Sequence, residues 1–185
     1  MNNLDFLTLD SWITSDNHWG HENIRKYGCR PQGHFEFMRK RWIQNVQPDD
    51  VLLHLGDIVC FGDQTKHLEW IEGLPGDKYL IRGNHDKHPD EWYEQAGFTV
   101  LGRGTKPFYW VDPRNGDLIA FSHEPLGGYT GEGWFPFTWN IHGHIHINPL
   151  WDEYDRQEQR INVCVEVTNY APIRLRDLID KSVDN

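Results

Sequence analysis

The chain has 185 residues, a formal net charge of -10 and 38% hydrophobic residues, which together predict one globular domain over residues 1–185 and exclude a disordered chain. No apolar run approaches the about 20 residues that span a bilayer, and no basic-then-apolar leader opens the chain, so we expect neither a membrane partner nor secretion. The acidic charge argues against a strong nucleic-acid surface, and the three scattered cysteines favour a reducing, cytoplasmic location.

The first part of the chain alternates between strand and helix patterns. Between residues 34 and 46, Phe35, Met38 and Trp42 are spaced for one face of a helix. The apolar run at 51–55 has the length of a buried strand and is stopped by a glycine and an aspartate. The elements predicted here are a strand at 12–14, a helix at 34–46, a strand at 51–55, a helix at 63–72 and a strand at 78–82.

The second part of the chain predicts strands in succession. Residues 108–111 and 118–122 flank a turn of the Asp-Pro-Arg-Asn-Gly type and should form an antiparallel hairpin. Further strands are expected at 139–142 and 160–167, and a short helix at 175–180. Strands and helices in alternation, followed by strands in succession, predict an α/β sandwich of two mixed β-sheets flanked by helices.

Polar side chains gather where the predicted strands end. The clusters are Asp16-Asn17-His18, Gly56-Asp57, Gly83-Asn84-His85-Asp86, His123 and Gly143-His144-Ile145-His146. Ligands in α/β folds bind in loops beyond the carboxyl ends of strands, and histidine is the commonest metal ligand. The clusters therefore predict a metal site, whereas His54, inside an apolar run, is expected to be a packed core histidine.

Taken singly, several clusters have a structural alternative. Asp16 can form an Asx turn, Asp57 can cap the following helix, and His144 and His146 can line one side of an exposed strand. Two imidazoles at i and i+2 of an extended segment point the same way and can also reach one metal cluster. The neighbouring Asp86 suggests that a carboxylate orients His85 and keeps it basic.

Together, the clusters resemble the calcineurin-like metallophosphoesterase superfamily. Its pattern runs Asp-x-His, Gly-Asp, Gly-Asn-His-Asp, a lone His and Gly-His-x-His, and this chain supplies each in order from Asp16 to His146. The stretches TSDNHWGHENI and INVCVEVTNYAPIRLRDL are similar to a subgroup of small bacterial and phage phosphoesterases.

The resemblance implies a site with two divalent metal ions and a catalytic histidine. One ion would be held by Asp16, His18, Asp57 and His146, and the second by Asp57, Asn84, His123 and His144, so that Asp57 bridges them. His85 would act near the leaving group, with Asp86 orienting it. Carboxylate, amide and imidazole ligands suit manganese, iron, zinc or nickel rather than magnesium alone.

The expected function is dinuclear-metal-dependent hydrolysis of a phosphate ester by metal-activated hydroxide. A phosphodiesterase acting on a nucleotide or another small diester leads, ahead of a nuclease and then a phosphomonoesterase. A non-catalytic scaffold of the same fold is the remaining alternative, and the intact ligand set favours the enzyme.

Three further residues are candidates for contact with substrate. His21 would touch the substrate phosphate or brace a ligand, and Arg82 would bind phosphate or pair with a surface acid. Trp134 belongs to the aromatic, glycine-rich segment 127–139. This segment would stack an aromatic part of the substrate, or else form a dimer contact or pack over the core.

Overall fold

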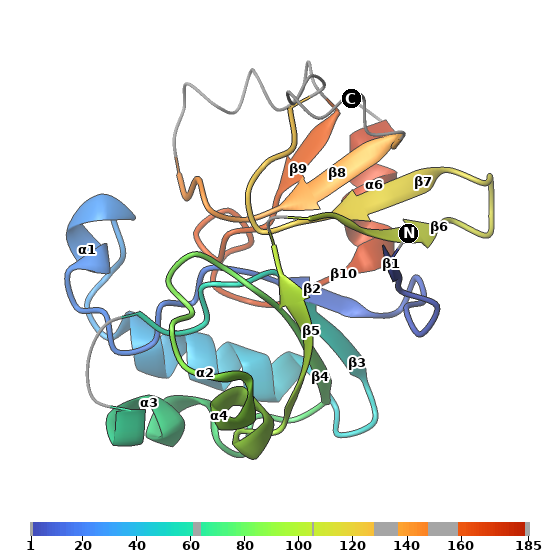
Figure 1. Ribbon diagram of the computed structural model, residues 1–185. Helices are drawn as coiled ribbons and strands as arrows, with labels where there is room; N and C mark the ends of the chain where they lie inside the picture. Colours follow the sequence, from blue (N-terminus) through green and yellow to red (C-terminus); the bar gives the residue numbers. More distant parts are fainter. Residues whose placement is uncertain (1, 61–63, 105, 128–136, 148–158, 184–185) are drawn as a thin grey trace.

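Two five-stranded sheets form the frame of the described part of the protein (Figure 1). The structure is a computed structural model that describes residues 2–60, 64–104, 106–127, 137–147 and 159–183. One sheet has the order β10-β2-β3-β4-β5 and the other the order β1-β6-β7-β8-β9. The strands are β1 (Asn2–Asn3), β2 (Trp12–Thr14), β3 (Val51–His54), β4 (Asp77–Arg82), β5 (Phe98–Arg103), β6 (Phe108–Val111), β7 (Leu118–Phe121), β8 (Trp139–His142), β9 (Arg160–Asn162) and β10 (Ile173–Arg174).

Both sheets mix parallel and antiparallel pairs, as the sequence predicts. In the first sheet β2, β3, β4 and β5 are parallel to one another and β10 is antiparallel to β2. In the second sheet β6 and β7 form the expected antiparallel hairpin. Beyond this hairpin the later strands are parallel, because β7 pairs with β8 and β8 with β9 in parallel.

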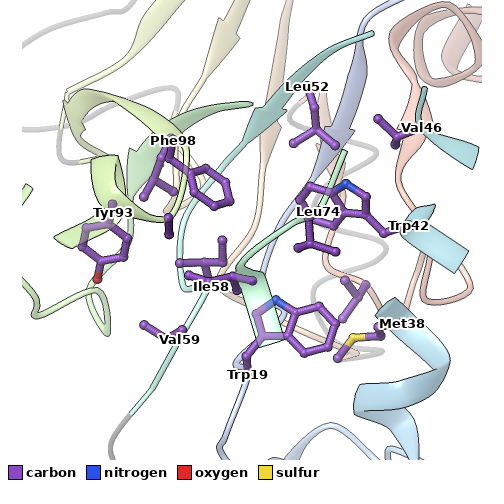
Figure 2. Packing of buried hydrophobic residues seen from close by; sticks show 14 of the residues in the cluster. Trp19, Met38, Trp42, Val46, Leu52, Ile58, Val59, Leu74, Tyr93 and Phe98 are labelled. Atoms are coloured by element: carbon purple, nitrogen blue, oxygen red, sulfur yellow. The ribbon is translucent and has the colours of Figure 1, made fainter. Parts of the chain in front are cut away.

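Side-chain alternation along β3 directs its apolar residues to two separate cores. Leu52 of β3 packs toward the helices α2 (His34–Asn45), α3 (Gln64–Ile71) and α4 (Asp90–Gln95), which cover one face of its sheet (Figure 1). Figure 2 shows Trp19, Met38 and Trp42 in this cluster. The next residue, Leu53, lies between the two sheets with residues of β6, β7, β8 and the helix α6 (Leu175–Val183).

The strand expected at 160–167 is shorter than predicted. Strand β9 ends at Asn162, after which Cys164 makes an isolated bridge to Ser15, the residue that follows β2. The amides of Val167 and Thr168 then bond back to the Cys164 carbonyl in a turn. The chain therefore leaves the second sheet and pairs with the residue that follows β2. The apolar residues Val163 and Val165 are buried along this segment.

Several short elements escape the sequence patterns: α1 (Ile24–Tyr27), α4, β1, β5 and β10. Each is at most six residues long, and β5 carries a glycine, Gly102, near its register irregularity with β4. In the described residues, no helix has the length and apolar character that crossing a bilayer requires.

Candidate metal centre

The predicted polar clusters lie together at one edge of the sandwich. Asp16 and His18 follow β2, Asp57 follows β3, and Asn84 follows β4, at the carboxyl ends of three parallel strands. His123 follows β7, and His144 and His146 follow β8, at the corresponding ends of the second sheet. Both sheets thus contribute side chains to one cluster.

Two groups of potential ligands face each other across Asp57. Asp16, His18 and His146 form one group and Asp57, His123 and His144 the other, with the ligand atoms of each group within 4.8 Å of one another. The Asp57 Oδ2 atom lies 3.6 Å from His18 Nε2 and 3.3 Å from His123 Nε2, so it reaches both groups.

The seventh candidate ligand, Asn84, lies on the same side as His123 and His144. Its Oδ1 atom is 2.9 Å from His123 Nε2 and 3.0 Å from His144 Nδ1. The amide oxygen therefore points at the same place as these two imidazoles. All seven side chains that the sequence analysis singled out as ligands are gathered at this edge.

The backbone at these positions adopts an unusual conformation. Five of the candidate ligands have φ between 51° and 72°, a region that costs a non-glycine residue of order 1–3 kcal/mol. The five are Asp16, His18, Asp57, His144 and His146. Such strain persists where surrounding contacts fix it, and here it turns successive side chains into one cluster.

Two glycines let the turns approach each other closely. A Cβ atom at Gly83 would collide with the carboxylate of Asp57, and one at Gly143 would collide with the side chains of Ser15 and Asp16. The glycines of the Gly-Asn-His-Asp and Gly-His-x-His patterns therefore have a steric role. A larger residue at either position would push apart the loops that carry the candidate ligands.

The hydrogen bonding at Asp16 and His18 fits a bound metal. Asp16 Oδ2 accepts bonds from the Ser15 hydroxyl, the His144 amide and the Cys164 thiol. Asp16 Oδ1 and both ring nitrogens of His18 are buried without a hydrogen-bond partner among the described residues. Buried polar atoms seldom lack partners, and carboxylate and imidazole atoms left in this way suit a divalent transition metal.

Charges within the cluster compensate one another. Burial alone would raise the pKa of Asp16, but the His18 imidazole, 3.7 Å from its carboxylate, and the other nearby imidazoles hold it well below its usual range. Burial likewise opposes protonation of His123, but Asp57 and Asp16 raise its pKa to about 9. Both carboxylates therefore stay ionised at neutral pH, as metal ligands must be.

His85 and Asp86 lie beside the cluster with separate partners. The His85 amide donates to Asp57 Oδ1 at 2.7 Å, and the His85 Nδ1 atom lies 3.3 Å from Cys60 Sγ. Burial raises the pKa of the Cys60 thiol to about 12, with the Asp57 and Asp86 carboxylates adding to the effect. Cys60 therefore remains a neutral thiol at neutral pH.

Asp86 lies among backbone amides of two turns. Its fully buried carboxylate accepts hydrogen bonds from the backbone amides of Asp57, Ile58 and Gly83 at 2.7, 3.1 and 2.8 Å. These bonds tie the turn after β3 to the turn after β4, and the expected orientation of His85 by Asp86 stays a prediction. The Asp86 carboxylate therefore stabilises the backbone of the two loops that carry Asp57 and Asn84.

The three candidate substrate contacts have different outcomes. Arg82 is buried and donates to the Asp90 carboxylate and to the carbonyls of Asp86 and His88, which is the alternative of pairing with an acid; its contact with phosphate stays a prediction. His21 lies near the cluster, with its ring centroid 5.8 Å from that of His18. Trp134 lies outside the described residues.

Sequence reasoning assigned no role to Arg30 and Glu166, which form a buried ion pair behind the first ligand group. Arg30 Nε is 2.7 Å from Glu166 Oε1, and the same oxygen is 3.0 Å from His146 Nδ1. The Arg30 guanidinium also donates to the carbonyls of Asp16 and Asn17. These residues carry no local pattern, because the two partners are 136 positions apart. His54, as expected, is a fully buried core histidine.

Comparisons with known proteins agree with this architecture. A family model described as calcineurin-like phosphoesterase matches residues 10–175. An uncharacterized protein of Methanocaldococcus jannaschii is 36% identical, over 94% of this chain and 90% of that protein. The Gene 66 protein of Mycobacterium phage L5 is 32% identical, over 81% of this chain and 84% of that one. A solved structure of a protein of unknown function from Aquifex aeolicus has a TM-score of 0.69 and 30% identity, over 92% and 97% of the two chains.

Proposed function

Because the chain belongs to the calcineurin-like phosphoesterase family, we propose that it is a dinuclear-metal-dependent phosphodiesterase that hydrolyses a nucleotide or another small phosphodiester. The observation that carries the proposal is the position of Asp57, whose Oδ2 atom lies within 3.6 Å of His18 and 3.3 Å of His123. A carboxylate between two groups of imidazoles is the arrangement that a bridging ligand needs.

The proposed ligand sets follow from the two groups. One divalent ion is held by Asp16, His18, His146 and the bridging Asp57, and the other by Asp57 with Asn84, His123 and His144. Mixed oxygen and nitrogen donors favour manganese, iron, zinc or nickel over magnesium. Bound ions would supply an acidified water as nucleophile and neutralise charge on the phosphoryl oxygens.

His85 is the residue of this chain that handles the leaving group. Its backbone amide is fixed to Asp57 Oδ1, and its ring lies 5.3 Å, centroid to centroid, from that of His18. A protonated imidazole beside the cluster can donate a proton to the departing oxygen, a role commonly worth about 10²–10⁴-fold in rate. Asp86 contributes by holding the two turns at their separation.

A small substrate is favoured by the charge of the molecule. The formal net charge of -10 repels a long polyanion, while a pair of dications bound to two carboxylates leaves a local positive charge for a single phosphate. Turnover of polymeric DNA or RNA at rates above those for small diesters would replace the small-diester proposal with a nuclease.

The bridging role is tested with Asp57→Asn and a matched control, Asp77→Asn. Asp77 is an exposed residue at the opposite end of β4 from the cluster. We expect the wild type and the control to carry two ions per chain by elemental analysis and to hydrolyse bis-p-nitrophenyl phosphate. Asp57→Asn should lose loading at both sites together. Full two-metal occupancy in this variant would contradict the bridge.

The leaving-group role is tested with His85→Ala. This variant should keep both metals and lose most turnover on a diester with a poor leaving group. Hydrolysis of a p-nitrophenyl ester should suffer less, because p-nitrophenolate departs without protonation. An equal loss on both substrates would rule out proton donation by His85.

A further inference from the structure

A thiol and imidazoles form a second cluster beside the candidate metal centre. Cys60 Sγ belongs with His18 and His21 to a group whose potential ligand atoms all lie within 4.8 Å of one another. His85 Nδ1 is a further 3.3 Å neighbour of the sulfur. Cys60 and His18 are almost fully buried, at 1% and 2% exposure, while His21 is half-buried.

The donors of this cluster differ chemically from those of the candidate metal centre. The centre offers carboxylate, amide and imidazole groups, which suit harder or borderline cations. Thiolate and imidazole are instead the donor types that tetrahedral zinc prefers, so one thiol with two or three imidazoles suits this ion. His18 is common to both clusters: its Nε2 atom faces the carboxylates of Asp16 and Asp57, and its Nδ1 atom has no hydrogen-bond partner in the described residues. The Nδ1 atom can bind a cation on this side when the ring and the Cys60 thiol release their protons to solvent.

Backbone contacts hold the two loops of this cluster in place before any ion arrives. Trp19 pairs with Val59 in an isolated bridge, and its amide bonds to the Ile58 carbonyl at 2.9 Å. The Trp19 ring is fully buried in the same core cluster as Met38 and Trp42 (Figure 2). His21 is turned back by a bond from its amide to the His18 carbonyl. The ligands therefore need little reorganisation to close on a cation.

We propose that Cys60 and His21, together with His18, form a third cation site that takes a thiophilic divalent ion such as Zn²⁺. An ion there engages His18 and stands against the ring of His85. Occupation of the site therefore inhibits the hydrolase. Binding at this site stands independently of the proposed function, and the inhibition rests on it.

Cobalt substitution tests the binding. The candidate metal centre contains no thiol, so a thiolate-to-cobalt charge-transfer band in the near ultraviolet reports a cysteine ligand. We expect metal-free protein to take up three equivalents of Co²⁺, with the band developing as the third site fills. Cys60→Ser should lose the band and bind two equivalents. Cys29→Ser is the matched control and should keep the band. Cys164 lies in a separate potential ligand group with His146 and Glu166, so Cys164→Ser tests the alternative thiol and should also keep the band.

A second variant keeps the test sharp if Cys60→Ser folds poorly. His21→Ala removes a half-buried ligand and should lower the affinity for the third Co²⁺ ion by roughly tenfold or more. Even the loss of an indirect partner of a metal site lowers metal affinity by about 10–100-fold. A band that survives in Cys60→Ser, a band that vanishes in Cys164→Ser, or saturation at two equivalents without a band would each overturn the site.

Inhibition is measured separately. Excess Zn²⁺ should slow diester hydrolysis by the manganese-loaded wild type, and Cys60→Ser should resist it. Equal sensitivity of the two proteins would refute the inhibitory role. A cysteine-dependent cobalt band in a protein that hydrolyses no phosphodiester would keep the third site and reject the proposed function.

Discussion

Replacement of Glu166 by glutamine should leave the buried Arg30 guanidinium without its carboxylate partner. Both side chains have 0% exposure, and Arg30 Nε lies 2.7 Å from Glu166 Oε1. Loss of one partner from a buried ion pair costs about 3–5 kcal/mol, because the remaining charge stays desolvated. Glutamine keeps an oxygen acceptor, so we expect the lower end of this range, about 3 kcal/mol.

The same substitution should weaken the first metal site. Glu166 Oε1 lies 3.0 Å from His146 Nδ1, which leaves the opposite nitrogen, Nε2, to face Asp16 at 3.9 Å. A carboxylate behind a ligating histidine fixes its tautomer and raises its basicity. Metal affinity at this site should fall about 10–100-fold in Glu166→Gln, while the second site changes little.

Urea unfolding of the metal-free protein, followed by the fluorescence of its nine tryptophans, measures the loss of stability in Glu166→Gln. Calorimetric titration with Mn²⁺ measures the loss of metal affinity. Glu94→Gln, on the exposed surface of α4, is the control and should change stability by less than about 0.5 kcal/mol. A double-mutant cycle with Arg30→Met isolates the coupling between the partners. Equal stability of Glu166→Gln and the control, with unchanged metal affinity, would refute the reasoning.

Three other substitutions probe the core, a surface carboxylate and a glycine. Leu53→Ala, between the sheets, should lower the free energy of unfolding by about 2–5 kcal/mol, whereas Val111→Ala at an exposed position should cost far less in the same urea titration. Burial alone would raise the pKa of Asp50. Hydrogen bonds from a backbone amide, an indole and an arginine outweigh this effect and hold the pKa below its ordinary value of 3.8. Its stabilisation is complete above pH 3.8 and is lost as pH falls through the folded-state pKa, so acid titrations should show a smaller loss in Asp50→Asn than in the wild type. Gly143→Ala should reduce metal uptake in elemental analysis, because its Cβ collides with Asp16.

The sequence predicts this fold well where a pattern is local and long enough. The spacing of Phe35, Met38 and Trp42 predicts a helix at 34–46, and α2 spans His34–Asn45. Polar residues directly after apolar runs predict which side chains meet, because parallel strands end at a common edge. The seven predicted ligands do meet there, and their binding of metal stays a prediction.

The remainder depends on pairings between distant residues. Glu166 and Arg30 are linked across 136 positions, and no periodicity relates them. Asp86 is adjacent to His85 in sequence, yet its carboxylate binds amides of the turn after β3, since burial favours the partners that satisfy both oxygens. Strand β5 is not predicted from the sequence, because a six-residue segment that contains a glycine shows little alternation of apolar and polar residues.

The order of elements along the chain determines when the candidate metal centre can form during synthesis on the ribosome. Strands β2 to β5 are complete by Arg103, but His144 and His146 follow β8, and Glu166 emerges later still. The free edge of β2, next to Asp16, is covered only when β10 arrives at Ile173. A nascent chain stalled before β8 therefore carries part of each ligand group, including both carboxylates, beside an unpaired strand edge, which is a template for aggregation. The proposed ions could therefore gain their full ligand sets only after β8 and the residues that follow it have been made.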